Sequence, residues 1–223
     1  MGSRKLIPLG VRFPNPHEVV GYYDEWSYYY SPNFAGCNVK GVVDLTDFAV
    51  LERFSAPMNE ITGLLGYKEL PLRTIQLGEN ALAGVFDASG MATLEELWLY
   101  YNETLTGVDL TGCTGLMMFA IDSSGVAAID VSDCVQLCYA YAYDCAQLAS
   151  IVGLANTQID SVGFFNCALP EAEVDGVLAA CVIVGKEYGW CDLSGGSNAP
   201  PSAEGEGYKT ILESRGWSVM VNS

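Results

Sequence analysis

The chain has 223 residues, half of which are hydrophobic, and its formal net charge is −17. This composition predicts one or two folded domains and excludes a disordered chain. The negative charge argues against nucleic acid and anionic membrane surfaces as partners. It fits a protein that must resist self-association at high local concentration, or one that meets a basic partner or cations.

The sequence predicts neither a membrane span nor a secretory signal. No apolar run approaches the roughly 20 residues that cross a bilayer. The positive residues Arg4 and Lys5 precede no apolar core, since prolines interrupt the segment that follows. We therefore expect synthesis in a cytoplasm, association with a particle such as a virion, and no membrane insertion. The cell surface, or release by a non-standard route, is the alternative location.

A repeat of 21 or 22 residues organises the chain between Leu51 and Leu169. The spacing L-x-x-L-x-L-x-x-N-x-L recurs six times in this stretch, and its clearest copy begins at Leu94. A fixed period of this length predicts a solenoid. The first positions of the six copies are Leu51, Leu72, Leu94, Leu116, Leu137 and Ile159.

Each copy predicts a short strand followed by a turn. The L-x-L core places alternate side chains inside and outside, and neighbouring coils are expected to pair as a parallel sheet. The asparagine position predicts hydrogen bonds to the backbone of the turn, because an amide both donates and accepts. That position is filled by Asn59, Asn80, Asn102, Ser124, Cys145 and Cys167.

A second pattern recurs in the other half of the coils. Asp44, Asp87, Asp109 and Asp130 are each followed two residues later by Thr or Ser. Side chains in this pattern typically cap local backbone groups of a turn. A stacked column of aspartates that holds calcium is the alternative. The glycine-rich nonapeptides of calcium-binding β-rolls are absent, so we expect no metal site.

The eight cysteines are expected to be reduced structural thiols. Cys113 and Cys134 each precede the first position of the next copy by three residues, which predicts small buried side chains that stack between coils. If one disulfide forms, Cys181 and Cys191 are the expected pair. No C-x-x-C pair is present, which weakens a zinc interpretation.

The regions on either side of the repeats differ from them. We divide the chain into an N-terminal aromatic-rich segment at 1–42, the repeats at 43–169 and a C-terminal cap at 170–223. The N-terminal segment is either a cap over the first coil, which solenoids need for solubility, or a docking arm, and both uses can coexist. Its aromatic residues include Tyr22, Tyr23, Trp26, Tyr28, Tyr29 and Tyr30.

The C-terminal region predicts a strand–helix–strand cap. Acidic residues after Pro170 begin a helix whose apolar stripe includes Val174 and Cys181. A strand is expected at 190–193, a loop at 195–201, a helix at 208–215 and a last strand at 217–221.

The stretch Leu94-Glu95-Glu96-Leu97-Trp98-Leu99-Tyr100-Tyr101-Asn102 resembles a short bacterial leucine-rich repeat, as does Val108-Asp109-Leu110-Thr111-Gly112-Cys113 after it. Internalin-like surface proteins and related phage proteins share this cycle. The resemblance covers residues 43–169, and 189–221 more loosely. It implies an α/β-type leucine-rich-repeat solenoid with a parallel β-sheet on its concave face and little helix in the repeats. It also implies a binding function without catalysis.

The outward residues of the predicted strands form an aromatic floor on that concave face. A surface rich in tyrosine and tryptophan is typical of an interface. A protein partner or another copy of the chain, a glycan stacked on the rings, and the chain's own N-terminal arm are the three candidate occupants. The candidate partner-binding residues are Trp98, Tyr100, Met118, Asp122, Tyr139, Tyr141, Tyr143 and Phe165.

The sequence predicts neither an enzyme nor a bound cofactor. The single histidine, His17, lies outside the repeats, and no nucleophile elbow, phosphate loop or zinc-protease motif occurs. We expect a non-catalytic protein that acts through protein–protein contacts as a structural or surface component of a particle, such as a decoration or tail protein of a phage virion. The alternative is a recognition or adhesion module that binds a host protein or glycan on its aromatic concave face.

Overall fold

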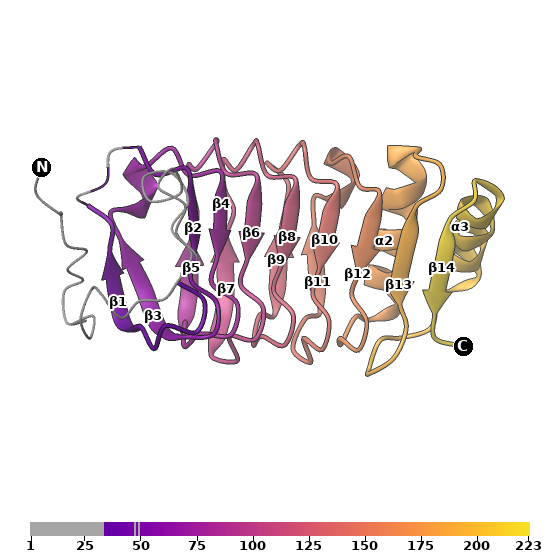
Figure 1. The fold of residues 1–223 in the computed structure, drawn as a ribbon. Helices are drawn as coiled ribbons and strands as arrows, with labels where there is room; N and C mark the ends of the chain where they lie inside the picture. The colour runs from indigo at the N-terminus through magenta and orange to yellow at the C-terminus, as the bar shows by residue number, and fades with distance from the viewer. Residues whose placement is uncertain (1–33, 47, 49) are drawn as a thin grey trace, which may run out of the picture.

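A computed structural model describes residues 34–46, 48 and 50–223. Within these residues the chain forms a solenoid of parallel strands with two α-helices near its C-terminal end (Figure 1). The predicted docking-arm residues between Tyr22 and Tyr30, and also His17, lie outside the described residues.

One continuous parallel sheet of eight strands runs along one side of the solenoid (Figure 1). Its register pairs equal repeat positions, since Leu97 lies opposite Ile75 on one side and Phe119 on the other. The strands in spatial order are β2 (Arg53–Ser55), β4 (Thr74–Gln76), β6 (Glu96–Trp98), β8 (Met118–Ala120), β10 (Tyr139–Tyr141), β12 (Ser161–Gly163), β13 (Trp190–Leu193) and β14 (Ser218–Val221).

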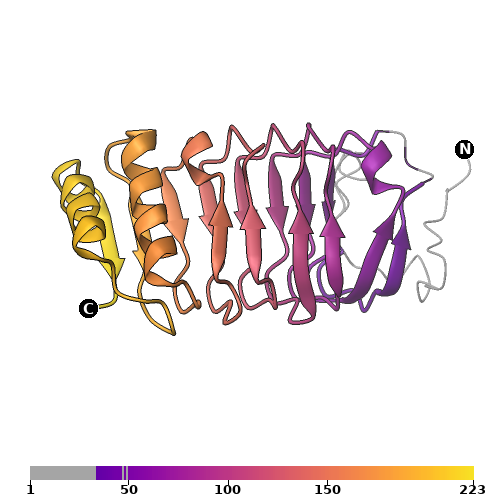
Figure 2. The same cartoon turned by 180° about the vertical axis from the view of Figure 1, so that it is seen from behind.

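The opposite side of the solenoid is built from small separate sheets and from helices (Figure 2). Three two-stranded parallel sheets pair β1 (Lys40–Asp44) with β3 (Glu60–Leu65), β5 (Gly84–Asp87) with β7 (Leu105–Asp109), and β9 (Ala128–Asp130) with β11 (Ser150–Val152). Toward the C-terminus the helices α2 (Glu171–Val184) and α3 (Ala203–Ser214) take over this side. Two 3-10 turns, η1 (Tyr67–Glu69) and η2 (Leu154–Asn156), complete the described elements.

The inward side chains of the coils form one apolar core. Leu77, Leu99, Ile121 and Ala142 occupy the same position in successive coils, and all four are fully buried. Burial of a leucine side chain contributes about 2 kcal/mol, which a single coil cannot obtain without its neighbours. Stacking of the coils in register is therefore what stabilises the fold.

The predicted asparagine ladder connects the coils. The side-chain oxygen of Asn80 accepts the backbone N–H of Ile61 at 2.9 Å. The amide nitrogen of Asn80 donates to the carbonyls of Ala56, in the preceding coil, and Leu77, in its own coil, at 2.9 and 3.1 Å. The predicted hydrogen bonds to the turn backbone are confirmed for Asn59, Asn80 and Asn102.

Thiols continue this ladder in the later coils, as the sequence predicts. The Cys145 thiol donates to the carbonyl of Ile121 at 3.2 Å. The Cys167 thiol donates to the carbonyl of Ala142 at 2.9 Å. All eight cysteines are free thiols in the structure, including the Cys181 and Cys191 pair.

The ladder returns to asparagine after the sixth repeat. Asn198 is buried, its side-chain oxygen accepts the N–H of Leu169 at 2.9 Å, and its amide donates to the carbonyl of Phe164 at 2.8 Å. The predicted loop at 195–201 thus contains the ladder position of a further coil. The repeat spacing does not reveal that coil, because its turn is longer. Asn198 follows Leu193 by five residues, whereas Asn80 follows Leu77 by three.

The aspartate pattern caps turns in the way that the sequence predicts. In one coil the carboxylate of Asp44 accepts the N–H and the hydroxyl of Thr46 at 3.0 and 2.7 Å. Asp87 with Ser89 repeats both bonds. Among the described residues, no group of three or more His, Cys, Asp or Glu side chains is arranged to hold a metal ion.

Coil-type pairing extends past the N-terminal boundary of the predicted repeats, and helices follow the repeats at the other end. The N–H of Phe34 donates to the carbonyl of Ser55 at 2.7 Å, so coil-type pairing reaches into the segment assigned to 1–42. At the other end α2 begins after Pro170, as predicted. Helix α3 begins at Ala203, earlier than predicted, because the Ser202 hydroxyl accepts two N–H groups of its first turn.

Candidate binding surface

The outward residues of the eight-stranded sheet lie in three rows, and we call the surface that they form the sheet face. The strand register defines the first two rows. The first row is Thr74, Glu96, Met118, Tyr139, Ser161 and Trp190, and the second row is Gln76, Trp98, Ala120, Tyr141, Gly163 and Asp192. The third row, fixed by equivalent backbone hydrogen bonds of the turns, is Gly78, Tyr100, Asp122, Tyr143 and Phe165.

All eight candidate partner-binding residues lie in these rows. Met118 and Tyr139 are in the first row, Trp98 and Tyr141 are in the second, and the other four are in the third. The repeat spacing was sufficient to place them, because side chains two residues apart along a strand point to the same side.

A first aromatic cluster lies on the coil of β6. The rings of Trp98 and Tyr100 meet edge to face, with centroids 6.5 Å apart, and Tyr101 meets Tyr100 in the same way at 6.0 Å. Tyr100 lies over Gly78 of the preceding coil, where an added Cβ would approach its ring atoms to 2.3 Å. Gly78 therefore provides the space that lets this ring lie over the preceding coil, toward the N-terminal end.

A second aromatic cluster joins β10 to β13. The rings of Tyr141 and Tyr143 are stacked with centroids 5.7 Å apart. Trp190 packs against both rings at 6.4 and 6.3 Å. Tyr143 lies over Gly163 of the following coil, where an added Cβ would approach its hydroxyl to 2.5 Å.

Trp190 is absent from the predicted partner-binding residues, although the sequence around it indicates an outward position on a strand. Trp190 and Asp192 alternate with the buried residues Cys191 and Leu193, which is the alternation of the repeats. The irregular spacing to Asn198 concealed this further coil.

The rings of the sheet face are supported by one another and remain accessible. Tyr139 and Phe165 are each 37% exposed, while Trp98, Tyr141 and Tyr143 are half-buried. The hydroxyls of Tyr141 and Ser161 are 3.1 Å apart and hydrogen-bonded. Rings held in this way lose little conformational freedom when a partner covers them, which favours binding.

Asp122 lies between the two clusters and carries a desolvated carboxylate. Its Oδ1 accepts the N–H of Tyr143 at 2.7 Å. Burial raises the pKa of Asp122, the Tyr143 hydrogen bond opposes that shift, and the charge of Asp144 adds to it. None of the ion pairs within the described residues involves Asp122. This carboxylate therefore has no cationic partner of its own in that part of the chain.

The acidic groups also affect the tyrosines. Burial raises the pKa of Tyr143 to about 12, helped by Tyr141 and by the charges of Asp122 and Asp192. Burial, Glu79 and Asp122 raise the pKa of Tyr100. Both phenols keep their protons at neutral pH, so the sheet face presents neutral rings in a negative field.

Two buried polar atoms near the first cluster lack a hydrogen-bond partner, the indole Nε1 of Trp98 and the hydroxyl of Thr74. An unpaired buried donor costs about 1–3 kcal/mol. These two unpaired atoms therefore lower the free energy of unfolding at the sheet face.

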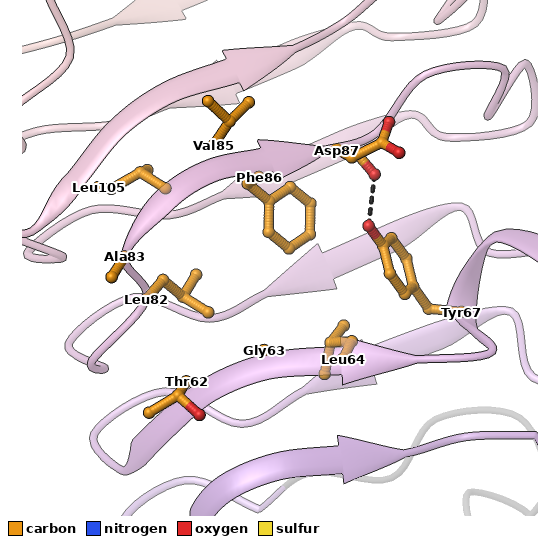
Figure 3. Close-up of a pocket in the computed structure, with 10 residues that line it drawn as sticks. All are labelled: Thr62, Gly63, Leu64, Tyr67, Leu82, Ala83, Val85, Phe86, Asp87 and Leu105. Carbon is orange, nitrogen blue, oxygen red and sulfur yellow. Dashed lines mark hydrogen bonds between the residues drawn. The ribbon is translucent and has the colours of Figure 1, made fainter.

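A separate hollow of about 160 Å³ lies on the opposite side of the solenoid, between β3 and β5 (Figure 3). The hydroxyl of Tyr67 donates to the carbonyl of Asp87 across one end of it. Lys68 pairs with the Asp87 carboxylate at 2.8 Å. The residues around it are Thr62, Gly63, Leu64, Tyr67, Leu82, Ala83, Val85, Phe86, Asp87 and Leu105.

This hollow marks a break in strand pairing. The sheets β1–β3 and β5–β7 are separate, and Tyr67 fills part of the space between them. The charged groups at its end are already committed to each other, since Lys68 and Ser89 hold the pKa of Asp87 down at about 2. We therefore assign the hollow a structural role and take the sheet face as the candidate site.

None of the helices in the described ranges is long and apolar enough to cross a bilayer. No family model, curated protein or solved structure shows significant similarity to the chain.

Proposed function

We propose that this chain is a leucine-rich-repeat protein of the internalin-like type that binds another protein through its sheet face and catalyses no reaction. We place it as a structural or surface component of a particle, such as a decoration or tail protein of a phage virion. The single observation that carries the binding proposal is that four large aromatic side chains lie on the same face of one continuous sheet. They are Trp98, Tyr141, Tyr143 and Trp190.

The leucine-rich-repeat assignment rests on three features that occur together. The leucine spacing, the parallel sheet in register and the amide ladder of Asn59, Asn80 and Asn102 each follow from one repeat unit. The helices α2 and α3 lie at the end of the coils, a position that suits a terminal cap.

The choice of a protein partner rests on residue chemistry. Tyrosine and tryptophan dominate the energetics of protein interfaces, particularly where their rings are fixed before binding. The strong negative charge limits contact between identical chains outside the intended assembly.

A recognition module for a glycan is the second candidate. The stacked rings of Tyr141 and Tyr143, beside the carboxylate of Asp122, offer a flat apolar platform with a hydrogen-bond acceptor. Such a platform suits the apolar face of a sugar ring.

Site-specific photo-crosslinking tests the proposal. A benzophenone amino acid is placed at Tyr139, which is exposed on the sheet face, or at Val85, which is 64% exposed on the opposite side. We expect one defined protein of the purified particle to be crosslinked from position 139 and not from position 85. Crosslinking from position 85 alone, or absence of the chain from particles on a density gradient together with binding to a glycan array, would contradict it.

A further inference from the structure

The acidic residues of the sheet face gather around the aromatic clusters. Glu96, Asp122 and Asp192 lie in the three rows, and Glu79 and Asp144 follow directly after the third. Glu79 and Asp122 act on Tyr100, while Asp122 and Asp192 act on Tyr143.

Positive charge is nearly absent from the same surface. Within the described strands of the sheet, Arg53 on β2 is the one cation at an outward position, and β2 is the end strand. Arg73 and Lys186 lie beside the sheet, but each already pairs with an acid, Glu95 and Asp160 respectively. The carboxylates between the aromatic clusters therefore lack counter-charges from the described chain.

The third row places Asp122 between two rings that lean apart, and we call the position above its carboxylate, between Tyr100 and Tyr143, the gap. Tyr100 leans over Gly78, toward the N-terminal end, and Tyr143 leans over Gly163, toward the C-terminal end. The two rings thus diverge from Asp122, which lies on the coil between them. Coils in a sheet are about 4.8 Å apart, so the flanking coils are separated by roughly 10 Å, which is wide enough for an extended side chain.

We propose that the sheet face binds a basic segment of a protein partner, with an arginine or lysine side chain seated over Asp122 between Tyr100 and Tyr143. A guanidinium or ammonium group there pairs with a carboxylate that has no other cation and contacts the faces of neutral rings. The surrounding acids attract the same segment before contact. This inference rests on the proposed protein-binding function and specifies the chemistry of the partner.

A peptide titration tests the inference. The probe is a fluorescein-labelled decapeptide of alternating arginine and glycine, and its anisotropy is followed with the full-length protein at 150 mM salt, a concentration that screens distant charges. Asp122→Asn with Asp144→Asn removes two charges from the gap. Asparagine keeps the oxygen that accepts the Tyr143 N–H, and Asp144 has a φ of 57°, which asparagine tolerates.

The matched control removes two charges elsewhere. Glu187 and Glu213 are exposed residues outside the sheet face, so Glu187→Gln with Glu213→Gln makes the same change in net charge. We expect the gap variant to bind the peptide about tenfold more weakly and the control variant to lose less than about twofold. Equal losses in both variants, or no binding by the unmodified protein, would overturn the inference.

A second readout separates this inference from the proposed function. The crosslink from position 139 to the particle protein is measured in the Asp122→Asn, Asp144→Asn variant. A crosslink that persists undiminished shows that the face binds a protein without a seated cation, which refutes the basic partner and retains the proposed function. Loss of the crosslink together with the weaker peptide binding supports the inference.

Discussion

The side chain of Asn102 joins its own coil to the preceding one at Leu77. Its amide donates to the carbonyl of Leu77 at 2.9 Å and to that of Leu99 at 2.8 Å. Its oxygen accepts the N–H of Leu82 at 3.0 Å. Asn102 is fully buried, so these backbone groups have no water to replace it.

Substitution of Asn102 by alanine is expected to lower the free energy of unfolding by about 3 kcal/mol, because it leaves buried backbone groups unpaired. The same substitution at Asn59, which is partly exposed in the first coils, is the control and is expected to cost less. Urea unfolding followed by circular dichroism measures both. Equal losses of unfolding free energy at the two positions would show that burial of the asparagine side chain does not determine its contribution to stability.

Thr74 and Thr157 form a matched pair for a second prediction. Both are 3% exposed, but the Thr74 hydroxyl has no partner, whereas that of Thr157 donates to the carbonyl of Leu154 at 2.7 Å. We expect Thr74→Val to raise the unfolding free energy by about 1 kcal/mol and Thr157→Val to lower it by a similar amount. Thermal and urea unfolding decide the signs. A loss of stability in Thr74→Val would contradict the unpaired hydroxyl.

Asp122 and Asp87 are expected to respond to pH in opposite ways. Burial raises the folded-state pKa of Asp122 above its ordinary 3.8, so the ionised side chain destabilises the fold at neutral pH. Asp122→Asn should therefore stabilise the protein at pH 7. The gain should shrink as the pH falls through the folded-state pKa and vanish below 3.8.

The lowered pKa of Asp87, about 2, gives the opposite sign. Its carboxylate stabilises the fold above pH 3.8, and this contribution is lost as the pH falls from 3.8 to 2. Asp87→Asn should therefore destabilise the protein at pH 7, and this loss of stability should shrink as the pH falls through 2. Unfolding of both variants between pH 2 and 7 measures the difference from the unmodified chain. The same sign of change at pH 7 in both variants would refute this account.

Gly78→Ala is expected to displace the ring of Tyr100, since the new methyl group would lie 2.3 Å from it. Binding of the arginine–glycine peptide should weaken severalfold, because one wall of the gap moves. Gly63→Ala is the control, because an added Cβ there approaches Val42 only to 4.0 Å. Anisotropy titrations compare the two variants. Unchanged peptide binding in Gly78→Ala would mean that Tyr100 does not contribute to the gap.

The repeat spacing predicts the solenoid because each coil is a local unit whose buried positions recur. Leu97, Asn102 and Asp109 are placed by that period alone, and the structure has them where the spacing predicts. The free thiols at Cys145 and Cys167 follow from the same stacking.

Three features of the sheet face depend on contacts between coils that the repeat spacing does not encode. Gly195 and Gly196, both at positive φ, lengthen the turn after β13. The repeat spacing therefore does not predict the coil that brings Trp190 to Tyr143. The directions in which Tyr100 and Tyr143 lean depend on glycines in neighbouring coils rather than on their own repeat. The desolvation of Asp122 likewise arises only after the coils have stacked.

The most direct test is the yield of the crosslinked particle protein from position 139 in the variant Trp98→Ala, Tyr141→Ala. Both residues lie in the second row, on either side of Ala120. We predict loss of the crosslink with a cooperative thermal unfolding transition retained, while the control Val85→Ala, Ile183→Ala crosslinks as the unmodified chain does. An unchanged yield in the folded Trp98→Ala, Tyr141→Ala variant would contradict the sheet face as the contact surface.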